Sequence, residues 1–214
     1  MLAKPVATTG FVLLLTSSIA IGLYAYAFQA GLTGSGGLQA SFAQVPVAAA
    51  AHVVGGGTVL LLGGFQFWTS LRRRQPQLHR WMGRVYLVLV GVGGFAGLYL
   101  ATRSMGGLVA HFGFGLLAVV WLYSGWQAYA AIRRGDVLTH RMWMIRNFAL
   151  AFAAVTLRIY LGVFAMLQVP FDQAYQSVAW ISWVPNLILV EWYFAYQARR
   201  AAQKRDAAIE SGSA

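Results

Sequence analysis

Residues 77–101 read QLHRWMGRVYLVLVGVGGFAGLYLA, and this stretch decides the fold class. After Arg84, no charged residue follows until Arg103. An apolar run of this kind can cross the hydrocarbon core of a bilayer as a helix, which takes about 20 residues. Similar runs lie on both sides of it along the chain. The sequence therefore predicts an all-α membrane protein.

Six transmembrane helices are predicted, and they form a single domain over residues 1–200. The spans cover roughly residues 8–29, 47–70, 77–101, 108–131, 139–166 and 177–198. We expect the four central spans to form a four-helix bundle of the haem-binding type. Residues 201–214 are small and polar, and are predicted to form a flexible cytoplasmic tail.

The composition supports a membrane protein and excludes several classes of chemistry. Charged residues make up 10% of the chain and hydrophobic residues 59%, whereas a soluble domain carries about 25% charged residues. The chain has no cysteine. This excludes disulfides, iron–sulfur ligation, thiolate catalysis and covalent attachment of c-type haem.

The net charge is +11. The basic residues that produce it are distributed as in a membrane protein and do not form a nucleic-acid-binding surface. Of the 16 Lys and Arg residues, only Arg103 and Arg158 fall toward one side of the membrane. The others gather in short loops and termini on the opposite side, which the positive-inside rule identifies as cytoplasmic. Both termini are then cytoplasmic, with no nucleic-acid partner. The first span lacks a clean cleavage site and is predicted to be an uncleaved anchor in the bacterial inner membrane.

The four histidines fall on four successive spans in a repeated pattern. In chain order they are His52, His79, His111 and His140. Arg72 precedes His79 by seven residues, and Arg133 precedes His140 by the same interval. The second and third spans thus resemble the fourth and fifth as an internal duplication. A parallel repeat of this kind implies a pseudo-twofold axis along the membrane normal.

The repeat places the histidines at two levels. His52 lies 20 residues before Arg72, and His111 lies 22 before Arg133, so at about 1.5 Å per residue both lie ~30 Å from the inner arginines. His79 and His140 open their spans at the inner side. Paired histidines on facing helices hold haem b. The pattern therefore predicts an outer site at His52 and His111 and an inner site at His79 and His140, with one or two haems.

Further side chains are expected to complete the inner site. Tyr86 and Asn147 each lie seven positions past a histidine, on the same helix face, and are expected to contact a haem edge. A group of arginines surrounds the inner pair and would hold haem propionates by charge-assisted hydrogen bonds. These are Arg80, Arg84, Arg141 and Arg146.

Three polar residues deeper in the spans are expected to have functional roles. Arg158 lies 18 residues after His140, which places it on the same helix face at the level of the outer histidines. A buried arginine is costly in a membrane, so we expect it to bind an outer haem propionate or an anionic substrate. Glu191 and Asn186 are expected to relay protons or to neutralise an inner arginine. A structural salt bridge is the alternative for Arg158 and Glu191.

Two resemblances follow from these residues. The runs HRWMGR at 79–84, HRMWMIR at 140–146, TLR at 156–158, and WVPN at 183–186 through Glu191-Trp192 resemble a bacterial membrane family known only as a domain of unknown function. This resemblance covers nearly the whole chain beyond the first span and implies no activity. The histidine layout also resembles the cytochrome b561 group of two-haem transmembrane oxidoreductases.

The second resemblance implies the same pairing, His52 with His111 and His79 with His140. It covers the second to fifth spans only, and no clear ascorbate-binding motif is present. The predicted function is transmembrane electron transfer through haem b, with donor and acceptor open and a quinone as one candidate. The alternatives are a small-solute or proton-coupled transporter that uses Arg158 and Glu191, and a non-catalytic subunit or assembly factor of a larger membrane complex.

The arginine asymmetry generates a test of topology. A reporter active only in the periplasm should stay inactive when fused at Arg200 and become active when fused at Ser41, because the positive-inside rule places these sites on opposite sides. Activity at Arg200 would contradict the assigned orientation. The two histidine levels called inner and outer would then be exchanged.

Overall fold

The computed structural model describes residues 3–33 and 36–212, and every regular element within them is a helix. The helices are α1 (Ala3–Gln29), α2 (Gly37–Ala43), α3 (Pro46–Gln66), α4 (Thr69–Arg74), α5 (Pro76–Ala101), α6 (Gly107–Arg133), α7 (Val137–Ala151), α8 (Ala153–Met166), α9 (Phe171–Ile181) and α10 (Val184–Gly212). In this part of the chain, six segments are long and apolar enough to cross a membrane. The all-α, six-span fold is therefore confirmed.

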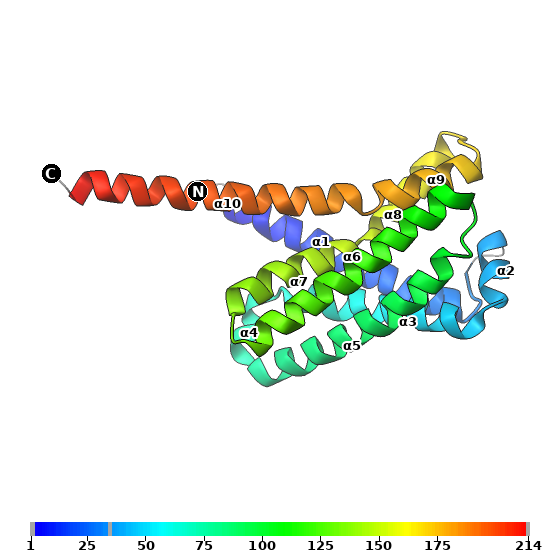
Figure 1. Cartoon of the computed structure of the whole chain (residues 1–214), viewed down its shortest axis with the longest axis horizontal. Coiled ribbons are helices and arrows are strands. Elements are labelled where there is room, and N and C mark those ends of the chain that lie inside the picture. The colour runs from blue at the N-terminus through cyan, green and yellow to red at the C-terminus, as the bar shows by residue number, and fades with distance from the viewer. Residues whose placement is uncertain (1–2, 34–35, 213–214) are drawn as a thin grey trace.

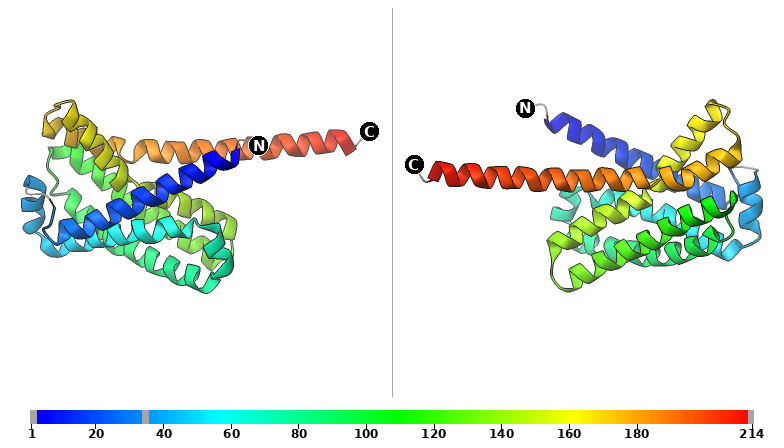
Figure 2. Two further views of the ribbon diagram at one scale, coloured as in Figure 1. Left: turned by 180° about the vertical axis from the view of Figure 1, so that it is seen from behind. Right: turned by 45° about the horizontal axis from the view of Figure 1, so that its top comes forward.

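Helices α3, α5, α6 and α7 form the centre of the molecule (Figure 1). In that order each packs against the next, α3 against α5, α5 against α6 and α6 against α7. Helix α1 packs against α3, and α10 packs against α7 and then projects beyond the bundle (Figure 2). Both chain ends lie toward the end of the bundle that carries α4 and the α6–α7 turn. The first and last described residues thus lie at the same end of the bundle, and the cytoplasmic orientation of this end stays a prediction.

The two helices that carry the inner histidines each begin with a recognisable start signal. Pro76 occupies the first turn of α5, where its missing N–H breaks no helical hydrogen bond. Asp136 caps α7, and its Oδ1 accepts a hydrogen bond of 2.9 Å from the backbone N–H of Thr139. Both helices therefore start within four residues of their histidine.

The last two spans are each broken, which the sequence analysis did not predict. Helix α7 ends at Ala151 and α8 restarts at Ala153, and a second break separates α9 from α10 at Ser182 and Trp183. Pro185 explains the second break because it cannot donate to a carbonyl four residues earlier. Thr156 Oγ1 and Asn186 Nδ2 both donate to the Ser182 carbonyl. Side chains thus satisfy a backbone group that the break exposes inside the bundle.

The ends of two spans also differ from those predicted. The second span ends at Gln66, and a separate short helix, α4, follows it. The sixth membrane-crossing segment begins at Phe171, six residues before the predicted start at residue 177. Of the predicted tail, residues 201–212 continue α10 as helix, and residues 213–214 lie outside the described part. The mobility of this tail stays a prediction.

The main buried core lies at the centre of the bundle. It contains Val59 and Leu60 of α3, Tyr86 and Val90 of α5, and Phe148 of α7. Gly63 allows this packing, because a Cβ there would lie 2.4 Å from the Phe148 ring. Any larger residue at position 63 would force α3 and α7 apart.

The cap at Asp136 makes the start of α7 sensitive to acid. Hydrogen bonds from the Thr139 side chain and backbone hold the pKa of the Asp136 carboxyl below its usual range. Because the folded pKa is the lower one, the cap stabilises the fold fully above the unfolded value of about 4. This stabilisation is lost as the pH falls through the folded pKa.

Asp136→Asn should therefore flatten the acid limb of the stability profile, since Asn caps helices without titrating. Thermal unfolding in detergent between pH 2.5 and 6 measures this, with the unsubstituted chain as reference. Identical pH profiles for the two proteins would show that the cap contributes nothing to acid stability.

Candidate functional site

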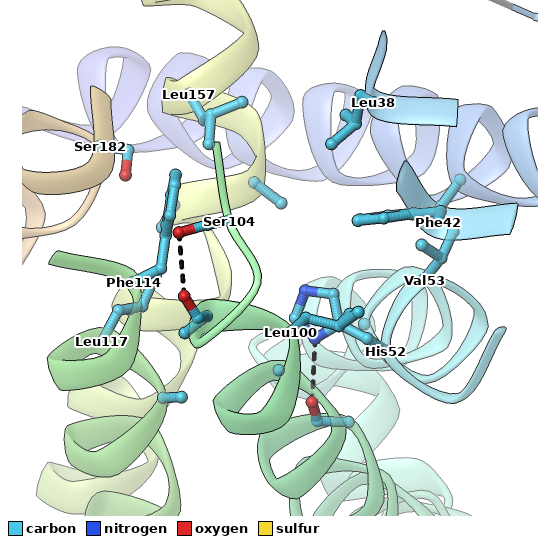
Figure 3. Close-up of a pocket in the computed structure, with 18 of the residues that line it drawn as sticks. Leu38, Phe42, His52, Val53, Leu100, Ser104, Phe114, Leu117, Leu157 and Ser182 are labelled. Carbon is cyan, nitrogen blue, oxygen red and sulfur yellow. Dashed lines mark hydrogen bonds between the residues drawn. The ribbon is translucent and has the colours of Figure 1, made fainter. Parts of the chain in front are cut away.

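A cavity of about 540 Å³ lies at the end of the bundle opposite the chain termini (Figure 3). Residues of α1, α2, α3, α5, α6 and α8 form most of its wall. It reaches from Ser104, in the α5–α6 turn, to Leu60 and Trp121 in the packed core. Its volume falls within the range of about 300–1,000 Å³ that is typical of small-molecule sites. Most of its lining is apolar, with a few polar side chains.

One hydrogen bond holds His52 against α5, and a glycine of α5 makes room for its ring. Its Nδ1 lies 2.9 Å from the Gly93 carbonyl oxygen. Gly97 leaves room for the ring, because a Cβ there would lie 2.7 Å from Nδ1. A carbonyl can only accept, so Nδ1 carries the proton and, in the neutral ring, Nε2 is an acceptor. Figure 3 shows this second nitrogen on the side of the ring away from the carbonyl.

Arg158 lines the same cavity from α8 without a carboxylate partner among the described residues. Its Nη1 donates to the Ala154 carbonyl at 2.7 Å, and its guanidinium lies 4.9 Å from the centre of the Tyr24 ring. It is close enough to His52 to interact with it electrostatically. The alternative of a structural salt bridge does not hold for Arg158 within the described residues, whereas Glu191 does form one, with Arg146. A half-buried arginine with so few partners leaves N–H groups available to a ligand.

Two further polar groups of the cavity wall lack partners. The Nε1 of Trp121 and the hydroxyl of Ser182 are buried, and neither has a hydrogen bond within the described residues. A buried donor without a partner costs free energy unless water or a ligand satisfies it. No signal in the sequence marks these residues, because a tryptophan or serine in an apolar run looks like any other packing residue.

The structure brings His52 to the cavity but does not bring His111 there. The Nε2 of His111 lies 2.9 Å from the Ser104 carbonyl oxygen, seven residues earlier in the chain. His111 does not line the cavity. Its Nε2 donates to that carbonyl, so only Nδ1 is left as an acceptor. The predicted outer pair would form only if His111 left this hydrogen bond.

The inner histidines lie near one another. His79 and His140 are close enough to interact electrostatically, although they belong to different helices, α5 and α7. His140 Nδ1 lies 2.8 Å from the carbonyl oxygen of Ala128 in α6, and therefore donates to it. Its Nε2 remains an acceptor in the neutral ring. The His79 ring has no hydrogen bond to any other described residue, and its own backbone carbonyl accepts one from Gln66.

The inner arginines fall into two groups. Arg80, Arg84 and Arg141 are exposed at the surface beside the inner histidines. Arg146 instead forms a bidentate pair with Glu191, with Nε–Oε1 at 2.6 Å and Nη2–Oε2 at 2.9 Å. Glu191 thus neutralises an inner arginine, which is one of the two roles expected for it.

Asn186 is engaged at the helix breaks. Its Nδ2 lies within hydrogen-bond distance of the Ala149 carbonyl, the Thr156 hydroxyl and the Ser182 carbonyl. It therefore ties α10 to both halves of the broken fifth span, at the level of the cavity floor. Its donors are used by the fold.

Tyr86 and Asn147 form a hydrogen bond with each other, and neither side chain lines the cavity. The Tyr86 hydroxyl donates to Asn147 Oδ1 at 2.8 Å, and both residues are 0% exposed. Asn147 Nδ2 donates at 2.8 Å to the Trp121 carbonyl and at 2.8 Å to Ser124 Oγ. Two positions that the sequence repeat makes equivalent thus meet at the centre of the bundle. They link α5, α6 and α7.

Removing the amide of Asn147 should destabilise the bundle. Asn147→Leu leaves the buried Tyr86 hydroxyl without an acceptor, at a cost of about 1–2 kcal/mol in a membrane bundle. Adding Tyr86→Phe removes the orphaned hydroxyl, so the double substitution should cost less than the sum of the two single ones. Unfolding in mixed detergent micelles measures this, with Gln127→Leu as a control at a surface hydrogen bond. Additive losses would show that the two side chains are not coupled.

Comparison with known proteins adds a family but no activity. Curated proteins and solved structures give no match to this chain. None of the comparisons relates it to the cytochrome b561 group, so that resemblance rests on the histidine layout alone. Residues 49–194 match the family model described as "Predicted membrane protein (DUF2306)". That match spans most of the chain, from the second predicted span to the last, and this protein belongs to the DUF2306 family of membrane proteins.

Proposed function

We propose that the protein transfers electrons across the bacterial inner membrane through a b-type haem held by His79 and His140. The observation that carries this proposal is that these two histidines open α5 and α7 at the same end of the central bundle, where they interact electrostatically. Haem b supplies one-electron redox chemistry when it is bound, and two imidazoles from facing helices are ligands that it commonly takes.

The donor set at the inner level fits this group. His140 has its Nδ1–H tied to the Ala128 carbonyl, which fixes its tautomer and directs Nε2 elsewhere. Such a bond from the second ring nitrogen is how proteins orient a metal-ligating histidine. The His79 ring has no competing hydrogen bond within the described residues. Arg80, Arg84 and Arg141 carry charges that no carboxylate neutralises in this part of the chain, and they would pair with propionates.

The proposal assigns one haem rather than two. The cavity at the other level offers His52 alone, because His111 holds its Nε2 on Ser104. A second haem between His52 and His111 would need this bond to break. We therefore assign the cavity to a small molecule that exchanges electrons with the haem, with the quinol–quinone couple as the natural class in a bilayer.

A small-solute transporter is the second candidate, and the cavity favours it. Arg158 offers a positive charge without a carboxylate partner inside an apolar chamber, which suits a small amphipathic anion. A transporter needs no haem, so the presence or absence of bound haem decides between the two functions.

A reduced-minus-oxidised spectrum of the purified protein, expressed with added haem precursor, tests the proposed function. We expect a b-type signal with about one haem per chain. His79→Ala and His140→Ala should each abolish the signal, because both ligands serve one iron.

His111→Ala should keep the signal, whereas a two-haem protein would lose about half of it. Unfolding of each variant in detergent shows whether it is folded. A protein that stays colourless and takes up no added haem would contradict the proposal and leave the transporter reading.

A further inference from the structure

We infer that the cavity at His52 and Arg158 binds a quinol, an aromatic ring with hydroxyl groups and an apolar tail. The inference rests on the proposed electron-transfer function for its choice of ligand class. The site itself is drawn from the cavity alone and involves neither inner histidine. The inference therefore identifies the class of ligand at the level of His52, which the sequence analysis left open.

The tautomer of His52 determines which hydrogen-bonding group the ligand must have. With Nδ1–H donated to the Gly93 carbonyl, Nε2 of the neutral ring can only accept. A ligand that satisfies it must present a donor, such as a hydroxyl. A quinol has this donor. A quinone, which has carbonyls in the same places, does not.

Arg158 is the cationic donor of the wall. Its Nη1 donates to the Ala154 carbonyl, and its other N–H groups have no hydrogen bond within the described residues. They call for an oxygen acceptor on the ligand. A ring that carries a hydroxyl beside His52 and further oxygens elsewhere meets both demands. A fatty-acid carboxylate would satisfy Arg158 but would leave Nε2 without a donor.

The rest of the cavity fits a ring and a tail. Phe42, Phe114 and Trp121 supply aromatic surface, and aliphatic side chains of α3, α5 and α8 supply the remainder. Such surfaces favour aromatic and apolar groups, while the few polar groups set the orientation of the ligand. Figure 3 shows Leu38 and Phe42 on one side of His52, and Phe114 and Ser104 on the other.

The test measures binding and does not depend on electron transfer. Full-length protein in lipid nanodiscs is titrated under argon with ubiquinol-1, and in parallel with ubiquinone-1 and with laurate, by isothermal calorimetry. We expect ubiquinol-1 to bind about tenfold or more tightly than ubiquinone-1, because only the quinol donates to Nε2. His52→Leu should remove this preference, and Arg158→Gln should weaken both redox forms by about tenfold or more.

Two matched pairs keep the test falsifiable if His52→Leu fails to fold. Trp121→Phe reduces the aromatic surface of the wall and should weaken binding, whereas Trp126→Phe makes the same change at an exposed position of α6. Arg134→Gln, at the opposite end of the molecule, is the control for Arg158→Gln.

Three results would overturn the inference. These are equal binding of quinol and quinone, tighter binding of laurate than of ubiquinol-1, and binding that Arg158→Gln and Trp121→Phe leave unchanged. The haem spectrum of the same preparation separates the two proposals. A colourless protein that binds ubiquinol-1 with these variant effects upholds the site and contradicts the haem. A coloured protein that does not bind it contradicts the site alone.

Discussion

The amide of Asn147 is the interaction on which the inner half of this protein depends. In a bilayer, packing is not driven by water, and a buried amide must find its partners inside the bundle. Asn147 finds them on two other helices, at Tyr86 of α5 and at Trp121 and Ser124 of α6. These bonds fix the vertical register of α5, α6 and α7. Because His79 and His140 each precede a member of this network by seven residues, the same bonds hold the two histidines at one level.

The outer half is built on a different principle. There the fifth and sixth spans are broken, and Thr156 and Asn186 donate to backbone carbonyls near the breaks. The breaks separate the course of α8 from that of α7, and residues on both sides of the first break line the cavity. The outer half of the molecule is therefore hollow. Trp121 joins the cavity to the Asn147 network, since its carbonyl accepts from Asn147 while its side chain lines the cavity.

The sequence predicted the features that depend on neighbours along the chain. Six spans, the start of α5 at Pro76 and the cap at Asp136 follow from hydropathy and local chemistry, and all are present. Spacing also shows that Tyr86 and Asn147 each lie on the same helix face as a histidine. It does not show that these two side chains bond to each other. The ion pair of Arg146 with Glu191 joins residues 45 positions apart, so no local pattern announces it.

The fate of the outer histidines shows the same limit. Spacing placed His52 and His111 at one depth, yet depth says nothing about which way each ring turns. That choice is made by acceptors within reach, the Gly93 carbonyl for one and the Ser104 carbonyl for the other. No proline or glycine in the sequence marks the break at residue 152. Pro185 does mark the second break, but a proline alone does not show whether a helix bends or ends and begins again.

The length of α10 has a consequence outside the membrane. Its 29 residues run from the cavity level to Gly212, well past Arg200, and Figure 2 shows the last part standing clear of the bundle. A short free helix in water is opposed by the difficulty of its first turn, but this one continues a helix already nucleated among its neighbours. Residues 201–212 therefore form an arm of about 18 Å. The length of this helical arm sets how far from the bundle anything joined to the C-terminus is carried.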